Sequence, residues 1–313
     1  MRDCDRRSFI KTCGIGAAAA ASVGYSSVEG LLAAPSQPRL SIVRYKLSPA
    51  EEEGIAEEAG RLTRKAIEAL GGMARFVSRG QVVCVKPNLS WERKPAQAAT
   101  TNPDVVATIV KLCYEAGAKD VFVADHTCNM AQRTYDRSGV KKAAEAAGAR
   151  VVFVDQRRFR AMAINGKILK EWEMYTEMAE ADTLINAYIV KQHNLCAATL
   201  GMKNLMGAIG GQRNRYHQDI GGTVADLAAF LKPKLVVMDA IRVLANNGPV
   251  GGNLADVKRK DIVAAGTDQV AIDSFGASLL GLRPEQVQYI AEAARRGLGA
   301  IDYKSVSPRE QTI

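Results

Sequence analysis

Short apolar runs separated by helical segments constrain the fold of this chain more than any other feature. The runs at 81–86, 120–125 and 150–155 have the sequences QVVCVK, DVFVAD and RVVFVD. Continuous valine-rich runs of this length are typical of strands that are buried on both faces of a sheet. Helical patterns at 102–117 and 139–148 lie between them. Strands that alternate with helices predict an α/β fold with a mostly parallel sheet flanked by helices.

The remaining segments extend the same pattern over residues 35–313, which we expect to form one α/β domain of two closely joined lobes. A capped helix is predicted from the serine, glutamates and final glycines of 48–72. Further strands are expected at 40–47, 182–190, 234–243 and 261–266. Further helices are expected at 194–206, 221–231, 268–280 and 284–296.

The first 34 residues resemble a twin-arginine export signal. Arg6 and Arg7 precede a Phe-Ile-Lys triplet and then a short run rich in alanine and glycine. The run is too short and too weakly apolar to span a membrane, and no span is expected in the mature chain. We expect cleavage between Ala21 and Gln37 and export to the periplasm by the Tat machinery. An ordinary secretory signal with a basic start is the alternative.

The composition is typical of a folded, soluble protein. Hydrophobic residues make up 47% and charged residues 24% of the 313 residues, which is ordinary for a globular chain. The formal net charge is +9, but the basic residues are scattered and aromatics are only 6%. A basic groove with stacking aromatics is therefore absent from the pattern, and nucleic acid is not an expected partner. The charge indicates either a solvated cationic surface or a site for a small anion.

Six cysteines are present, and two of them lie in the expected signal peptide. The other four have no C-x-x-C spacing, so a ferredoxin-type iron–sulfur or zinc site is not expected. Cys84 and Cys113 fall in apolar segments where buried thiols are common. A disulfide bond between two of the four is an alternative outside the cytoplasm, but their spacing does not indicate which cysteines would pair.

Polar residues follow several of the expected strands, where ligands bind at the carboxyl edge of open parallel sheets. Each residue alone has a structural explanation as a strand end, a turn cap or a satisfied histidine. Several strands with ionisable ends together favour a shared site. The side chains concerned are Lys86, Asn88, Asp125, His126, Lys191, His193 and Asp239.

Two later loops add candidates. The segment ANNGPVGGN at 245–253 either forms a plain loop or offers the free amides of Gly248 and Gly251 to an anion. Thr267 or Asp268 is expected to cap a helix. Asp273 is either a buried capping partner or a carboxylate of the site.

The stretch KQHNLCAATLGMKNLMGAIGGQRNRYH at 191–217 holds two of the three histidines of the chain. We expect a buried helix here whose apolar side chains, such as Leu195 and Leu205, face the core. His193, Lys203 and Asn204 are not needed for packing, and such groups must be paired or face a ligand when buried. The loop that follows carries Arg213, Arg215 and His217 and is expected to act as a flap over an anionic substrate.

These motifs, with VVCVKPNLSW, VVMDAIRVLANNGPVGGN and IVAAGTDQVAIDSFGASLLGL, resemble the DUF362 family, of unknown function. The resemblance covers about residues 80–282. Many members carry an appended ferredoxin-like cysteine cluster. This chain lacks the cluster, so a redox role does not transfer from those relatives.

The order His126, His193, Lys203, His217 also resembles the nickel-pincer lactate racemases. That resemblance implies a lysine that tethers a pyridinium cofactor and histidines that bind nickel or move protons. On this basis, Asp125, His126 and His193 are candidate metal ligands, and His126, His193, Lys203 and His217 are candidate catalytic groups. Lys86, Asn88, Asn204, Gly248 and Gly251 are candidate cofactor-binding residues.

Three functions follow from the sequence. The first is an exported enzyme for a small anionic substrate with a divalent metal or nickel-containing cofactor. The second is a non-catalytic periplasmic binding protein for a small acid or phosphate compound. The third is a redox accessory protein that uses Cys128 and Cys196.

Overall fold

The computed structural model of the chain describes residues 38–46 and 54–313. The expected signal peptide and the start of the expected helix at 48–72 lie outside the described residues. The described residues lie in one compact unit. In the described part of the chain, no helix combines the length and the hydropathy that a membrane crossing needs.

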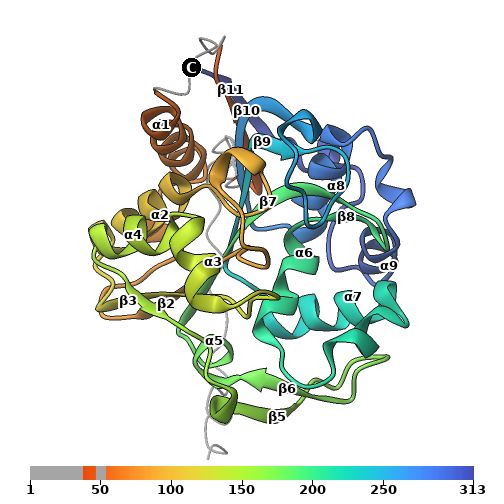
Figure 1. Cartoon of the computed structure of the whole chain (residues 1–313). Helices are drawn as coiled ribbons and strands as arrows, with labels where there is room; N and C mark the ends of the chain where they lie inside the picture. The colour runs from red at the N-terminus through yellow and green to blue at the C-terminus, as the bar shows by residue number, and fades with distance from the viewer. Residues whose placement is uncertain (1–37, 47–53) are drawn as a thin grey trace, which may run out of the picture. The chain divides into compact units, whose positions relative to one another are not determined.

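A nine-stranded sheet runs through the unit (Figure 1). Its order is β11-β1-β10-β9-β7-β2-β3-β4, and β8 pairs with β7 off this path. The pairs β4–β3, β3–β2, β2–β7, β7–β9 and β1–β11 are parallel, while β10 is antiparallel to both β9 and β1. The predicted α/β fold with a mostly parallel sheet is therefore confirmed. The strands are β1 (Leu40–Arg44), β2 (Val82–Pro87), β3 (Asp120–Ala124), β4 (Arg150–Val152), β7 (Thr183–His193), β8 (Ala197–Thr199), β9 (Leu235–Leu244), β10 (Val257–Gly266) and β11 (Arg309–Thr312).

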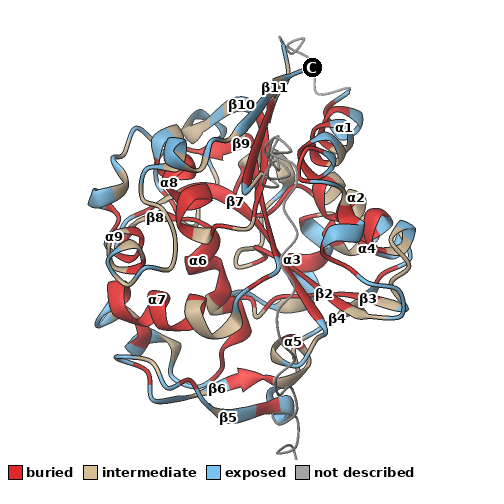
Figure 2. Ribbon diagram, turned by 180° about the vertical axis from the view of Figure 1, so that it is seen from behind, coloured by how far each residue is buried: buried red, intermediate tan, exposed pale blue. Residues whose placement is uncertain are grey.

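Helices cover both faces of this sheet (Figure 1). On one face lie α1 (Ile55–Glu68), α2 (Pro103–Glu115) and α4 (Val140–Ala146), and on the other lie α6 (Gly201–Asn204), α7 (Ile220–Leu231), α8 (Gln269–Leu279) and α9 (Gln288–Arg295). Strand β7 shows the alternation that serves both layers: Ile185 belongs to the core under the first group, and Tyr188 belongs to the core under the second. Both faces of the central strands are buried in consequence (Figure 2), as the continuous apolar runs predict.

Side-chain caps begin three of the predicted helices. Asn102 accepts a hydrogen bond from the backbone N–H of Asp104 at 2.8 Å at the start of α2, and Asp268 accepts two at the start of α8. At the start of α7, Asp219 accepts one from the backbone N–H of Gly222 at 2.9 Å. Helix α1 differs, because its described part begins after Gly54 without a side-chain cap and ends at Glu68, before the final glycines.

The sequence patterns missed a two-stranded antiparallel hairpin, the edge strand β11 and two short helices. The hairpin consists of β5 (Phe159–Ala163) and β6 (Glu171–Tyr175). The helices are α3 (Ala131–Arg137), which follows β3, and α5 (Thr176–Ala179), which follows β6. The carboxylate of Asp226 on α7 accepts hydrogen bonds from the three consecutive amides of Lys167, Ile168 and Leu169 in the hairpin turn. One buried carboxylate thus fixes the hairpin, and such a long-range contact leaves no local pattern.

The expected helix at 194–206 is wrong. Strand β7 continues to His193, turns, and pairs with β8 in the antiparallel sense, and only then does the short α6 begin at Gly201. The carboxylate of Asp273 accepts hydrogen bonds from the amides of Gly201 and Met202 at 2.7 and 2.8 Å, which fixes that start. Leu195, expected in the core, lies at the hairpin turn with 71% of its surface exposed.

Candidate functional site

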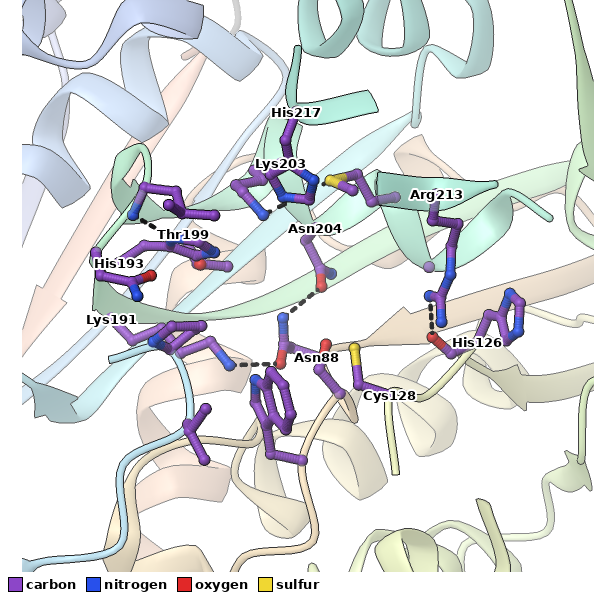
Figure 3. Close-up of a pocket in the computed structure, with 18 of the residues that line it drawn as sticks. Asn88, His126, Cys128, Lys191, His193, Thr199, Lys203, Asn204, Arg213 and His217 are labelled. Atoms are coloured by element: carbon purple, nitrogen blue, oxygen red, sulfur yellow. Dashed lines mark hydrogen bonds between the residues drawn. The ribbon is translucent and has the colours of Figure 1, made fainter. Parts of the chain in front are cut away.

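A pocket of about 360 Å³ lies beyond the carboxyl ends of the parallel strands β2, β3, β7 and β9. The loops after β2 and β3 supply Asn88, Trp91, His126 and Cys128, and the loop after β9 supplies Pro249 and Val250. The β7–β8 hairpin, α6 and the turn at 213–217 complete the wall, with Lys191, His193, Thr199, Lys203, Asn204, Arg213 and His217 (Figure 3). Open α/β sheets bind ligands at this edge.

Lys86 and Asp125 lie behind the wall and do not line the pocket. Their side chains form an ion pair with 2.7 Å between Nζ and Oδ1, and both are fully buried. Asp125 also accepts a hydrogen bond from the amide of Leu89 at 2.6 Å. Gly207 separates the pair from the pocket, and a Cβ at that position would clash with both side chains. The pair therefore shapes the site without contacting a ligand.

A chain of three asparagines holds Lys191 in place. Lys191 Nζ donates to Asn88 Oδ1 at 3.0 Å and to the carbonyl of Ala99 at 2.8 Å. The Asn88 amide donates to Asn204, and the Asn204 amide donates to Asn186. An ammonium carries three N–H donors, so two acceptors leave one donor for a ligand. Burial, and then the neighbouring charge of Lys203, lowers the pKa of Lys191 to about 7.

Lys203 has a different environment. Its Nζ lies 3.6 Å from the sulfur of Met206, and among the described residues no oxygen atom accepts a hydrogen bond from it. Only 8% of its surface is exposed, and burial lowers its pKa. The hydroxyl of Thr199, another lining residue, also has no hydrogen-bond partner in the described part of the chain. Buried polar groups normally have hydrogen-bond partners, so a polar ligand that supplies partners to these two groups would be stabilised in the pocket.

His193 and His217 face each other across one side of the pocket. Their ring centroids lie 6.3 Å apart and their planes differ by 29°. His193 Nδ1 accepts a hydrogen bond from the amide of Leu195 at 3.1 Å, so the neutral ring carries its proton on Nε2. Burial and then the charge of Lys203 lower the pKa of His193 to about 3 and also lower that of His217. Both rings are therefore neutral at pH 7.

His126 lies on the other side of the pocket with Arg213 (Figure 3). Its Nδ1 donates to the carbonyl of Ile209 at 2.8 Å, and its Nε2 faces the amide of Gln156 at 3.2 Å. Arg213 donates to the carbonyls of His126 and Thr127. The segment expected to be a flap is thus tied to the loop after β3. Arg215, its other arginine, is exposed and does not line the pocket.

The expected metal ligands do not come together. Asp125 is committed to Lys86 and Leu89, and both ring nitrogens of His126 have protein partners. Within residues 38–46 and 54–313, no group of three or more His, Cys, Asp or Glu side chains is arranged to hold a metal ion. The residues present thus do not fit a metal centre held by Asp125, His126 and His193.

The glycine-rich loop also differs from the expected anion nest. The amide of Gly248 donates to the side chain of Gln192, and the amide of Gly251 donates to the carbonyl of Asn247. Neither glycine lines the pocket. Gly248 instead permits close approach to β7, because a Cβ there would meet the carbonyl of Gln192.

Asp239 and Asp273, two further candidates, are structural. Asp239 lies inside β9 and not at its end, and accepts hydrogen bonds from the amides of Asn102 and Ile241. Asp273 lies on α8 and accepts hydrogen bonds from the first two amides of α6. Neither residue lines the pocket. Burial raises the pKa of Asp239 to about 6 and that of Asp273 to about 7.

The four described cysteines are free thiols. Burial raises the pKa of Cys196 to about 11, and its thiol donates to the carbonyl of Ala198. A protonated, buried thiol is a poor redox group. Cys128 is exposed at the pocket, but this environment for Cys196 does not favour a redox pair of the two.

Comparisons with known proteins place the chain in a family. The family described as "Domain of unknown function (DUF362)" matches residues 83–278. The chain belongs to the DUF362 family. The thylakoid-associated protein sll1697 of Synechocystis sp. is 29% identical over 271 residues, which cover 82% of this chain and 83% of that protein.

This DUF362 protein also has a distant likeness among solved structures. The lactate racemase apoprotein from Thermoanaerobacterium thermosaccharolyticum is 11% identical with a TM-score of 0.45. The alignment covers 76% of this chain but only 56% of that chain. A likeness of this size carries no argument about ligand or reaction, so the roles that the order of histidines and lysine implies stay a prediction.

Proposed function

We propose that this DUF362 protein binds a small anionic molecule, such as a carboxylic acid or a phosphate compound, in the pocket. One observation carries the proposal: Lys191, Lys203 and Arg213 line the pocket, and none of its described lining residues is Asp or Glu. Buried cations without a carboxylate partner are costly, and a bound anion offsets that cost. A volume of about 360 Å³ lies near the lower end of the range for ligand pockets, which favours a small molecule.

We propose further that the site is catalytic rather than only a receptor. His193 and His217 are neutral at pH 7, lie beside each other and face the same pocket as the two lysines. Neutral imidazoles accept protons from a reacting group, and such transfer contributes about 10²–10⁴-fold in rate. A protein that only binds an anion would need the lysines but not this pair.

Anion binding is tested by calorimetry and thermal melting with propionate, pyruvate and phosphate. The Lys191→Met variant should lose most of the affinity, because it removes the buried cation with a free donor. The Lys260→Met variant is the matched control, since Lys260 is an exposed lysine on β10. Equal affinity in wild type and both variants would contradict the proposed site.

The metal-dependent form of the enzyme hypothesis has less support. The described residues bring no metal-ligand cluster together, so no step is assigned to a metal. Metal analysis of protein purified from its native host, together with melting in added nickel, zinc or magnesium, tests this directly.

We also propose that the protein is exported by the Tat pathway. The support is the Arg6-Arg7 pair and the short apolar run that follows it. Such export delivers a folded protein, so the pocket would reach its compartment already assembled.

A further inference from the structure

We propose that Lys203 is a nucleophile that forms an imine with the carbonyl carbon of a small oxo acid. This inference rests on the proposed anion site and names its substrate class: a carboxylate that carries a ketone or aldehyde group. The carboxylate would bind the fixed cations, and the carbonyl group would meet the amine of Lys203.

The contacts of Lys203 suit a nucleophile and not a structural cation. Within the described part of the chain, its one hydrogen-bond contact is the Met206 sulfur at 3.6 Å, and a thioether is a weak acceptor. The amine is not held by a carboxylate, an amide or a carbonyl among the described residues. No strong acceptor therefore stabilises the protonated form of this amine.

Lys191 provides the contrast within the same pocket. Its Nζ donates to Asn88 Oδ1 and to the carbonyl of Ala99, and these acceptors stabilise the protonated form. Lys191 is thus built to hold a charge and orient an anion. The two lysines are close enough for the charge of Lys203 to lower the pKa of Lys191.

Burial also favours the neutral form of Lys203, in addition to the lack of strong acceptors around its amine. Its pKa is lowered, mainly by burial. An ordinary lysine with a pKa of about 10.4 is almost wholly protonated at pH 7 and does not attack a carbonyl. Desolvation in a pocket beside another cation is one of the known ways to activate a lysine.

The reaction balances without an oxidant or reductant. The nitrogen lone pair attacks the carbonyl carbon, the carbonyl oxygen takes a proton, and the nitrogen loses one, giving a carbinolamine. The C–O bond then breaks, the nitrogen gives up its second proton, the hydroxyl group leaves with that proton as water, and a C=N bond forms. His217 lies close enough to Lys203 for the charge of Lys203 to lower its pKa (Figure 3). Its neutral ring can carry the first nitrogen proton to the carbonyl oxygen and the second to the leaving hydroxyl group.

Reductive trapping tests the proposal. The full chain is incubated at pH 7 with cyanoborohydride and, in separate samples, pyruvate, 2-oxobutyrate or 2-oxoglutarate, and propionate serves as the anion without a carbonyl. At least one oxo acid should leave an adduct with the mass of that acid less one oxygen atom. Peptide mapping should place it on Lys203, at least about tenfold above any surface lysine, because those amines are protonated at this pH. The Lys203→Arg variant has no nucleophilic amine at this position and should lose the adduct.

The outcomes separate this inference from the proposed function. An adduct on Lys191, or one spread evenly over surface lysines, overturns the assignment to Lys203. Stabilisation by propionate and the oxo acids without any adduct overturns the imine but leaves the anion site. The absence of stabilisation and of adducts overturns both. Mapping within the wild-type protein decides the matter even if the Lys203→Arg variant does not fold.

Discussion

Lys86 and Asp125 form a fully buried ion pair, 2.7 Å between Nζ and Oδ1, directly behind Gly207 in the pocket wall. Neither side chain touches the pocket, yet together they support the strand ends that carry Asn88 and His126. The pair therefore contributes both to the position of the pocket wall and to the stability of the fold.

Replacing one partner of this pair should destabilise the protein strongly. We expect Lys86→Met to lower the free energy of unfolding by about 3–5 kcal/mol, because Asp125 would stay buried without its cation. Urea unfolding measures the loss. The double variant Lys86→Met with Asp125→Asn should lose less than the sum of the single variants, and strict additivity would contradict a direct coupling.

A methyl group at Gly207 should disturb the same wall. Because its Cβ would clash with Asp125 and Lys86, we expect Gly207→Ala to lower stability by about 1–3 kcal/mol and to weaken anion binding. Gly60→Ala is the control, since Gly60 lies inside α1 and its Cβ would meet only Thr108 Oγ1 at 3.3 Å. A Gly207→Ala protein that melts and binds like wild type would show that the wall is not tightly packed.

Anion binding should depend on pH near neutrality. The pKa of Lys191 is about 7, and only its protonated form attracts an anion. Affinity for propionate, which stays ionised, should be highest below pH 7 and fall by up to about tenfold per pH unit above it. Calorimetry between pH 6 and pH 9 measures this. Lys191→Met should bind weakly with a shallower profile, and an unchanged profile would remove Lys191 from the site.

Asp273 should make the free energy of unfolding depend on pH between about 4 and 7. Its pKa is raised to about 7 by burial, against an ordinary value near 4, so the folded state binds the proton more tightly than the unfolded state. The contribution of Asp273 to stability is therefore full below about pH 4 and is lost as the pH rises through about 7. The free energy of unfolding, measured from pH 4 to 8, should fall more steeply in wild type than in Asp273→Asn. Parallel curves would contradict this.

Export should require both arginines of the signal. We expect Arg6→Lys combined with Arg7→Lys to leave the full-length precursor in the cytoplasm, because the Tat machinery recognises the arginine pair. Cell fractionation and immunoblotting measure the distribution. Normal processing of the doubly substituted precursor would point to the general secretory route instead.

Strand ends were the most informative feature of the sequence. Valine-rich runs such as VVCV and VFVA predicted β2 and β3, and the edge rule for parallel sheets predicted that Asn88, His126 and His193 would meet. The sequence could not show that Asp125 turns inward to Lys86 while its neighbour His126 turns to the pocket. Adjacent residues point in opposite directions, and a tertiary partner decides which one faces a ligand.

The segment at 194–206 is an example in which the local apolar pattern does not predict the conformation. Its apolar spacing suits a helix, but pairing with β7 holds residues 197–199 in strand β8. Asp273 then fixes the start of the helix only at Gly201. Thr199 was missed as a lining residue for the same reason, because a helix would have placed it elsewhere. In the sequence, Thr199 is a threonine among small residues, and nothing else there indicates that it lines a pocket.

The β7–β8 hairpin also affects how this family can diversify. Because β8 pairs with β7 alone, off the path of the main sheet, insertions or replacements at the turn beside Leu195 break no pairing between the central strands. Such changes would alter the rim of the pocket, while Lys191 would stay on β7 and Lys203 on α6. In the proposed anion site, such changes would alter which part of the ligand is recognised at the rim and leave the charged interior in place.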